Sequence, residues 1–396
     1  MRAIKTLYEA MQDEQYVYEQ FSQVSQRKNI LFVCPMLSGR HLYRYLLPYL
    51  EMHKYGKANT ALTGLVKYSD KRYEDIEIQF GSREILWADL IVFPFTTQPL
   101  TDLFNRIRDI NPKIRIFYNI DFNYYLMHES HPYHAHISQP QVMYDIEDNV
   151  LASDVTLFTN QTLLEFVKNR VEQAAKDRHK DSPVITGFQT QALLTDIDIV
   201  RENLQGQVVV EPGDTLRIGV VCQDYHWKDI HAWSKQMQAI HEKHGDKVRF
   251  VMIGFDGVNA EKKSCIPPDI KFEYIPKGSI VHYFKELAAL SLDAVFIPLV
   301  RNAYNETSEG YNRFLEAAVL KIPVIVPDVS PYNMLDENVE DFMFLIKKKD
   351  DLLILISECI KKRDKLKAVG ERAYQEVYEK FTYHEANIVL LDRVLS

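Results

Sequence analysis

The sequence has few cysteines, no long apolar run and no excess of positive charge. Its four cysteines, Cys34, Cys222, Cys265 and Cys359, are scattered over 396 residues and form no CxxC pair. Such scattering indicates a reduced compartment and argues against a disulfide framework or a structural zinc site. No stretch reaches the roughly 18 apolar residues that a membrane-spanning helix requires. The formal net charge of −8, without a long basic run, argues against nucleic acid as the primary partner.

The N-terminal segment lacks the apolar core of a secretion signal. Residues 1–21 carry Glu and Asp among spaced apolar side chains, a pattern that predicts an amphipathic helix with Tyr18 and Phe21 on its packing face. We therefore expect a cytoplasmic protein without a transmembrane segment. Peripheral contact with a membrane stays open.

The chain does contain alternating short apolar runs and helix-length segments. With 46% hydrophobic and 26% charged residues over 396 positions, it is long enough for two globular domains. The apolar runs predict strands at 29–35, 90–95, 114–120 and 154–160, and then at 216–222, 248–254, 294–299 and 323–328. Helices are predicted at 98–110, 161–178, 229–244, 281–290 and 350–375. This order predicts an α/β protein of two Rossmann-like, doubly wound domains.

A weakly patterned stretch separates the two sets of strands. Within it, residues 205–215 contain two Gly and one Pro and are the best candidate for a linker. We predict one domain over 1–205 and another over 206–396, facing a common cleft.

Ligands of open α/β sheets bind beyond the carboxyl ends of the strands, so the residues that follow each run are candidates. Asp121 follows the run at 114–120, where its carboxylate could orient an acceptor hydroxyl. Lys228, in "CQDYHWKD" (222–229), could neutralise an anion at the start of a helix, or be an ordinary surface lysine. In "PMLSGR" (35–40), Gly39 could let the backbone, beside Arg40, approach a ligand, or simply serve a tight turn.

Four histidines follow Asp121 closely: His128, His131, His134 and His136. Dense imidazoles suggest a metal, but this spacing fits no standard zinc pattern, and a Tyr/His-rich acceptor loop explains it equally well. The sequence also lacks the GxGxxG, Walker A and GxSxG motifs. We expect no metal and no cofactor.

The segment "EGYNRFLEAAVLKIPVIVPD" (309–328) predicts a helix that leads into a buried strand. On a helical wheel its apolar side chains share one arc, and the opposite arc carries Glu309, Asn312, Arg313 and Glu316. Thr307 or Ser308 could cap a helix over 308–321. The polar arc is either a solvated face with i,i+4 pairs or a stripe that faces an anionic, hydroxyl-rich ligand. In both cases Glu316 lies away from the core.

The C-terminal half resembles nucleotide-sugar-dependent glycosyltransferases of the GT-B fold, close to the family 4 type. The resemblance runs through "IGVVCQDYHWKDI", "VMIGFDG" and the segment from "LDAVFIPL" to "FLEAAVLKIPVIVPDVSPY", and is strongest from 216 to 335. "IFYNIDFNYY" and "DNVLASDVTLFTNQTLLEFV" resemble a related bacterial subgroup. The resemblance implies transfer of a sugar from a UDP- or GDP-linked donor to a hydroxyl of a glycan, lipid-linked or other acceptor, with retention and without metal. It also implies an acceptor-side first domain, a donor-binding second domain, and a last helix that crosses back onto the first.

The resemblance implies roles for individual residues. Glu316 matches the glutamate that binds the ribose hydroxyls, and Lys228 matches the lysine that binds the pyrophosphate. Glu309 would lie near the donor sugar. The family usually spaces its two glutamates eight residues apart, whereas Glu309 and Glu316 are seven apart. Ser308 occupies the position expected for the first glutamate. With Asn312 from the polar arc, these residues form the predicted donor site.

The chain also departs from the family pattern. The arginine expected around 222–224 is missing, so Arg313 is predicted to supply that charge. Lys321 replaces the glycine that usually precedes the proline. The histidine common after an N-terminal strand is absent, and Asp121 is nearest to its place. We predict Asp121 and Glu309 as the catalytic residues, with Gly39 and Arg40 on the acceptor side.

Two other classes of function stay open. A GT-B-fold sugar-nucleotide epimerase would bind a nucleotide sugar and need no acceptor. A non-catalytic binding or assembly protein could keep the fold without activity, and the irregular glutamate spacing favours it.

Overall fold

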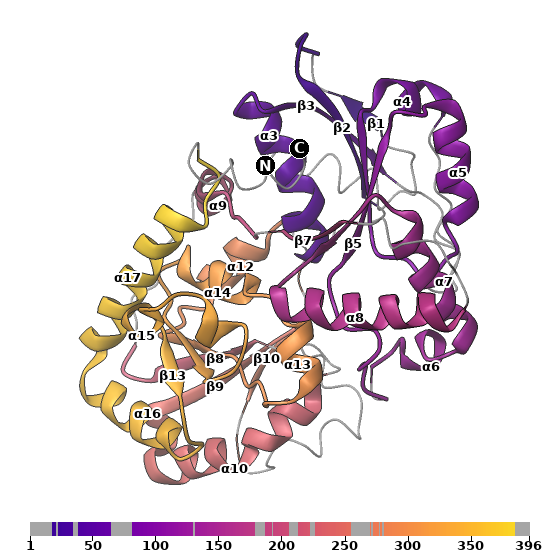
Figure 1. Cartoon of the computed structure of the whole chain (residues 1–396). Helices are drawn as coiled ribbons and strands as arrows, with labels where there is room; N and C mark the ends of the chain where they lie inside the picture. The colour runs from indigo at the N-terminus through magenta and orange to yellow at the C-terminus, as the bar shows by residue number, and fades with distance from the viewer. Residues whose placement is uncertain are drawn as a thin grey trace. The chain divides into compact units, whose positions relative to one another are not determined.

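A computed structural model describes residues 18–20, 23–34, 39–64, 81–129, 131–178, 187–191, 193–205, 213–221, 226–254, 270, 272–276, 278 and 281–384 (Figure 1). The chain divides into two compact units, residues 1–195 with 383–396, and residues 196–382. The sequence places the boundary at 205–206, whereas the units divide at 195–196, because helix α9 (Ile197–Leu204) packs on α12 (Tyr283–Ala289) of the second unit.

The first unit is built around one sheet with helices packed against it. Its described strands are β1 (Tyr18–Gln20), β2 (Lys28–Cys34), β3 (Ala58–Gly64), β4 (Leu90–Phe93), β5 (Arg115–Ile120), β6 (Val155–Phe158) and β7 (Gly187–Thr190). They form a seven-stranded sheet in the order β1-β3-β2-β4-β5-β6-β7, in which only β1 runs antiparallel to its neighbour. The helices are α2 (Gly39–His41), the π-helix η1 (Leu42–Leu46), α3 (Leu47–Lys54), α4 (Ser82–Trp87), α5 (Thr101–Ile110), α6 (His134–Ile137), α7 (Pro140–Ala152) and α8 (Gln161–Asp177).

The helix predicted over 1–21 is wrong at its C-terminal end. Tyr18–Gln20 form β1, and Tyr18 is paired with Thr63 of β3. A short strand can have the same mixed composition as an amphipathic helix, and three residues are too few to distinguish the two periods. The rest of that segment, apart from 18–20, lies outside the described residues.

The second unit contains a parallel six-stranded sheet. Its described strands are β8 (Leu216–Val221), β9 (Val248–Ile253), β10 (Glu273–Ile275), β11 (Ala294–Phe296), β12 (Val324–Pro327) and β13 (Phe344–Ile346). Their order is β10-β9-β8-β11-β12-β13, so the winding reverses between β8 and β11. Ligands of such sheets bind at this switch point, beyond the carboxyl ends of the two strands.

The helices of the second unit, after α9 and α12, fall between and beyond these strands. They are α10 (Trp227–His244), the 3₁₀ turn η4 (Gly245–Lys247), α13 (Ala303–Ser308), α14 (Asn312–Ala318), the 3₁₀ turn η5 (Tyr332–Met334), α15 (Val339–Phe342), α16 (Asp351–Lys361) and α17 (Arg363–Lys380). The helix predicted over 350–375 is therefore two helices. No helix in the described ranges is long and apolar enough to cross a membrane.

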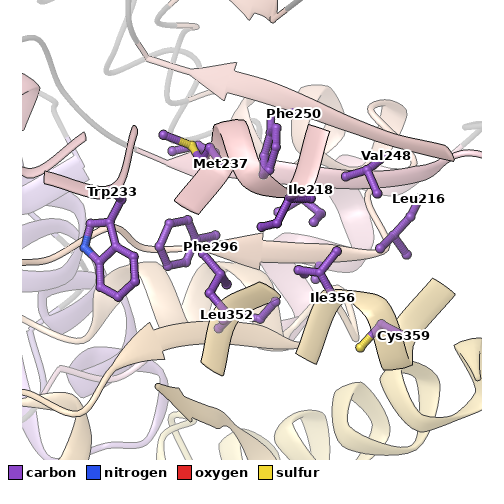
Figure 2. Packing of buried hydrophobic residues seen from close by; sticks show 14 of the residues in the cluster. Leu216, Ile218, Trp233, Met237, Val248, Phe250, Phe296, Leu352, Ile356 and Cys359 are labelled. Atoms are coloured by element: carbon purple, nitrogen blue, oxygen red, sulfur yellow. The ribbon is translucent and has the colours of Figure 1, made fainter. Parts of the chain in front are cut away.

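One hydrophobic core cluster of the second unit lies between the sheet and the pair α10 and α16 (Figure 2). Trp233 of α10 meets Phe296 of β11 edge to face, with ring centroids 5.3 Å apart, and its indole N–H donates to the Leu299 carbonyl at 3.0 Å. Cys359 of α16 is buried in the same cluster as a free thiol. This packing fixes where β11 ends, and so positions the segment that follows it.

The turn between α14 and β12 packs closely on α17. Lys321 in this turn has a φ of +59°, a backbone conformation that favours glycine. Its carbonyl lies against Gly370 of α17. A Cβ built at Gly370 would lie 2.1 Å from that carbonyl oxygen. We expect Gly370→Ala to lower the free energy of unfolding by about 1–3 kcal/mol, because the backbone of the turn must shift. Urea unfolding measures the effect. Gly213→Ala is the control, since its Cβ would have no atom within 4 Å, and equal losses in both variants would contradict the prediction.

Candidate functional site

Polar side chains gather at the switch point of the second sheet. The segment after β8 is described again from His226, which directly precedes α10, and the segment after β11 continues into α13. Asn302 caps α13 by accepting a hydrogen bond from the Asn305 N–H at 2.8 Å. Both segments begin where strands end, so their side chains meet beyond the carboxyl edge of the sheet.

The helix predicted over 308–321 is not continuous. α13 ends at Ser308, Glu309 is extended with φ −74° and ψ 137°, and α14 begins only at Asn312. The Thr307 hydroxyl donates to the Ala303 carbonyl inside α13, so neither Thr307 nor Ser308 caps the following helix. A wheel drawn through 309–316 therefore misplaces Glu309 relative to α14.

Three side chains from both segments form a buried cluster. His226 Nε2 lies 3.2 Å from Glu309 Oε1, and His226 Nδ1 lies 3.3 Å from the Arg313 guanidinium. Arg313 is also 3.7 Å from Glu309 Oε2. The exposed fractions of these side chains are 5%, 11% and 11% for His226, Glu309 and Arg313. The cluster holds opposite charges close together where water is largely excluded, which strengthens their interaction.

Glu316 lies one turn further along α14 and is buried. Only 8% of the residue is exposed, and its carboxylate accepts a hydrogen bond from the Tyr283 hydroxyl at 3.0 Å. The expectation that Glu316 faces away from the core is wrong, because α14 is short and is covered all around from Phe314 to Ala318. Burial raises the pKa of Tyr283 well above its usual value, and the Glu316 carboxylate raises it further, so the tyrosine stays a donor.

Asp229 and Asn305 join the two segments at a second point. The Asn305 side-chain amide lies 3.1 and 3.2 Å from the two carboxylate oxygens of Asp229, and it also donates to the Val300 carbonyl at 2.9 Å. Burial raises the pKa of Asp229 to about 7, although the hydrogen bond from Asn305 lowers it and the Glu309 charge raises it again. This carboxyl group changes its charge near neutral pH.

The other predicted donor-site residues lie around this cluster. Lys228 is exposed in the first turn of α10, with its ammonium 5.5 Å from the centroid of the Trp227 ring. Ser308 and Asn312 are half-buried on either side of the break that contains Glu309. The structure thus brings Glu309 and Arg313 into contact and places Lys228 on the helix that begins beside them.

The acceptor-side residues belong to the first unit. Asp121 directly follows β5, and its backbone carbonyl accepts from Thr159 at 3.1 Å. Burial raises the pKa of Tyr45 well above its usual value, and the Asp121 charge raises it further. Gly39 opens α2, and a Cβ there would meet no atom within 4 Å. The side chain of Arg40 and residues 35–38 lie outside the described part of the chain.

The histidine-rich segment is packed as part of the first unit. His131 stacks on Phe122 at 6.5 Å, and its Nδ1 accepts from the Tyr133 N–H at 3.2 Å. His136 Nε2 lies 3.1 Å from the Thr97 hydroxyl. Within the described ranges no group of three or more His, Cys, Asp or Glu side chains could hold a metal ion. His131 and His136 thus make packing and hydrogen-bonding contacts within the first unit.

Sequence reasoning did not single out several members of the site: His226, Asp229, Tyr283, Asn305 and Tyr332. Tyr332 belongs to it because its hydroxyl donates to the Gly310 carbonyl at 3.2 Å, beside the break in the helix. All of them except Tyr283 lie in segments that follow predicted strands, so the strand-end rule was a usable signal. Tyr283 opens α12 and reaches Glu316 only through the tertiary fold.

Comparison with known proteins identifies the fold. No protein-family model matches the chain, and no curated protein does. Among solved structures, an alpha-glucosyltransferase in complex with UDP is similar over 94% of this chain and 100% of its own, with a TM-score of 0.64 and 13% identity. Sucrose-phosphate synthase from Thermosynechococcus elongatus is similar over 93% and 98%, with a TM-score of 0.59 and 12% identity.

A third similar structure is HepE from Anabaena in complex with UDP and glucose, which covers 94% of this chain and 100% of its own at a TM-score of 0.54 and 13% identity. The architecture of this chain, with two Rossmann-like α/β units, is the GT-B fold. At these identities the likeness concerns the fold.

Proposed function

We propose that the protein is a glycosyltransferase that moves a sugar from a nucleotide-sugar donor to an acceptor hydroxyl. The observation that carries the proposal is the buried cluster of His226, Glu309 and Arg313 at the switch point of the second sheet. It lies where Rossmann-like sheets bind nucleotides. Structures named as complexes with UDP share the fold, which supports a nucleotide-sugar donor.

In this proposal the second unit binds the donor. Arg313 and Lys228 neutralise the diphosphate, whose negative charge grows as the bond between the anomeric carbon and the phosphate oxygen breaks. The Glu316 carboxylate accepts hydrogen bonds from the ribose hydroxyls, and the Tyr283 hydroxyl donates to the same carboxylate. Glu309 lies near the donor sugar, and Ser308 and Asn312 line the same edge.

The first unit supplies the acceptor side, and Asp121 is the group proposed to orient the acceptor hydroxyl. The acceptor oxygen forms the new bond to the anomeric carbon, and its proton leaves with the departing diphosphate or a nearby base. Stereochemical retention belongs to the proposal through the sequence resemblance alone. Independence from metal belongs to it because Arg313 and Lys228 supply positive charge at the leaving group. Transfer that stops in EDTA and returns with manganese or magnesium would refute metal independence.

A panel of nucleotide sugars tests the function directly. The protein is incubated with UDP- and GDP-linked sugars, hydrolysis is followed, and acceptors are then added and examined for a gain in mass. Sugar transfer supports the proposal. Conversion of one nucleotide sugar into an isomer without an acceptor would identify an epimerase, and binding without turnover would identify a non-catalytic protein.

Glu316→Gln keeps the shape of the side chain and removes its charge. We expect it to weaken binding of the cognate nucleoside diphosphate by about 1.5–3 kcal/mol, the range for hydrogen bonds to a charged group. Calorimetric titration measures the change. Because Glu316 is buried against Tyr283, the melting temperature is recorded for each variant. Glu371→Gln, at an exposed glutamate paired with Lys321, is the control. Wild-type affinity together with a lower melting temperature would show that Glu316 is purely structural.

A further inference from the structure

The contacts of the two His226 ring nitrogens indicate which of them carries the proton. Nδ1 lies 3.3 Å from the Arg313 guanidinium, a group that can only donate hydrogen bonds. Nδ1 must therefore accept, which requires its lone pair. The proton of the neutral ring then sits on Nε2, which lies 3.2 Å from the Glu309 carboxylate.

This arrangement makes the ring a link between two segments. His226 precedes α10, whereas Glu309 and Arg313 flank the break between α13 and α14. The guanidinium lies closer to the imidazole, at 3.3 Å, than to the Glu309 carboxylate, at 3.7 Å. His226 therefore accepts from the Arg313 guanidinium at Nδ1 and presents Nε2 to the Glu309 carboxylate at ion-pair distance, so the ring lies between the two charged groups.

We propose that neutral His226 is a positioning residue, which holds Arg313 and Glu309 in the orientation that the donor diphosphate requires. The proposal rests on the function proposed above. It adds a regulation of the same site: when Nδ1 takes up a second proton it loses its lone pair, faces the Arg313 donor as a second cation, and releases the guanidinium. Acidification thus weakens donor binding through this ring.

Several charged groups around the ring influence this step. Glu309 and Arg313 face it directly, and Asp229 and Lys228 follow it on α10. Glu316 adds a negative charge on α14, within the electrostatic reach of Tyr283 and Tyr332. Asp229 also titrates near neutral pH, so the contribution of His226 must be separated from that of Asp229.

Two substitutions make that separation. His226→Gln keeps an acceptor oxygen for Arg313 and an amide N–H that can face Glu309, but the side chain does not titrate. Leucine fills similar space and does neither. At pH 8 we expect His226→Leu to weaken UDP or GDP binding about 10- to 100-fold, as for loss of a hydrogen bond to a charged group. His226→Gln should stay within about threefold of the wild type.

The pH dependence gives a second readout. Calorimetric titrations with UDP and GDP at pH 5 to 8 yield the ratio of wild-type to His226→Gln affinity, in which the effects of Asp229 and of phosphate titration cancel. We expect this ratio to fall about tenfold or more as the ring is protonated. A ratio independent of pH, or a nucleotide affinity of His226→Gln at pH 8 as weak as that of His226→Leu, would overturn the proposal.

Nitrogen NMR of the wild-type protein labelled at histidine tests the geometry without any ligand. The His226 signals are assigned by their loss in His226→Gln, and we expect a protonated Nε2 and an unprotonated Nδ1 at pH 8. The opposite tautomer would overturn the proposal even if His226→Leu fails to fold. If the wild type binds neither nucleotide, the function proposed above fails, and the NMR result still decides whether His226 links Arg313 and Glu309.

Discussion

Glu309→Gln is expected to lower the turnover of sugar transfer about 100- to 1000-fold, the usual loss when one preorganised electrostatic group is removed from an active site. The carboxylate is held by His226 and Arg313, so its charge stands in a fixed position where positive charge develops on the donor sugar. The variant keeps the size and shape of the side chain beside His226 and Arg313, and nucleoside-diphosphate affinity should change much less than turnover. Steady-state kinetics with the donor and acceptor found by the panel measures the effect.

Glu306→Gln is the matched control for this variant. Glu306 lies three residues earlier, in the first turn of α13, and its carboxylate is 3.5 Å from the exposed Arg301. The same chemical change there removes a surface ion pair, which contributes little. Turnover of Glu309→Gln within threefold of the Glu306→Gln value would exclude Glu309 from the chemistry.

Asp229→Asn is expected to stabilise the folded protein at pH 8 by up to about 4 kcal/mol, and to do progressively less as the pH falls. The pKa of Asp229 is about 7 in the folded protein and near the ordinary aspartate value of 3.8 when unfolded. Between these values the folded state binds one more proton, so the wild-type free energy of unfolding decreases by about 1.4 kcal/mol per pH unit as the pH rises. Asparagine resembles the protonated form and removes this slope.

Urea unfolding at several pH values between 4 and 8.5 tests the sign. The two proteins should converge near pH 4 and separate as the pH approaches 7, with no further separation above pH 8. The full 4 kcal/mol is an upper limit, because asparagine keeps only one of the two acceptor oxygens that face Asn305. Asp246→Asn, at an exposed aspartate beyond the end of α10, is the control and should show no such divergence. Parallel curves for Asp229→Asn and wild type would contradict the prediction.

The sequence predicts the interior strands of both sheets except β3, and it misses the edge strands. β2, β4, β5 and β6, and then β8, β9, β11 and β12, coincide with predicted runs, because strands covered on both faces are continuously apolar. The edge strands β1, β7, β10 and β13 have three or four residues each and are partly polar. They carry too little hydrophobic signal to be recognised.

The missed strand β3 has a different cause. It lies inside the sheet, yet Asn59, Thr60 and Thr63 are buried in it. The Asn59 side chain bonds the Val24 N–H and carbonyl at 2.8 and 2.9 Å, and the Thr60 hydroxyl donates to the Tyr49 carbonyl at 2.7 Å. Buried polar groups are stable when their hydrogen bonds are satisfied, but a search for apolar runs passes over them.

The candidate site was predictable in its location and much less in its geometry. The strand-end rule points to the segments of His226 and Glu309, since it depends only on chain order. The helical-wheel prediction for residues 309–316 failed because a wheel assumes one unbroken helix. The extended backbone at Glu309 interrupts that helix. Contacts such as Tyr283 with Glu316 join residues 33 positions apart, and periodicity contains no information about them.

The return of the chain at Tyr383 makes the second unit an insertion within the first. Residues 196–382 are continuous, whereas the first unit consists of 1–195 and 383–396. The chain leaves the first unit after Thr195 and returns at Tyr383, whose N–H donates to the Thr195 carbonyl at 3.2 Å. On the ribosome, the inserted unit therefore has its complete sequence before the unit that starts the chain has its own. The two ends of the inserted unit also lie next to each other. This arrangement suits expression of residues 196–382 as a separate piece, or replacement of these residues in the first unit by a short loop.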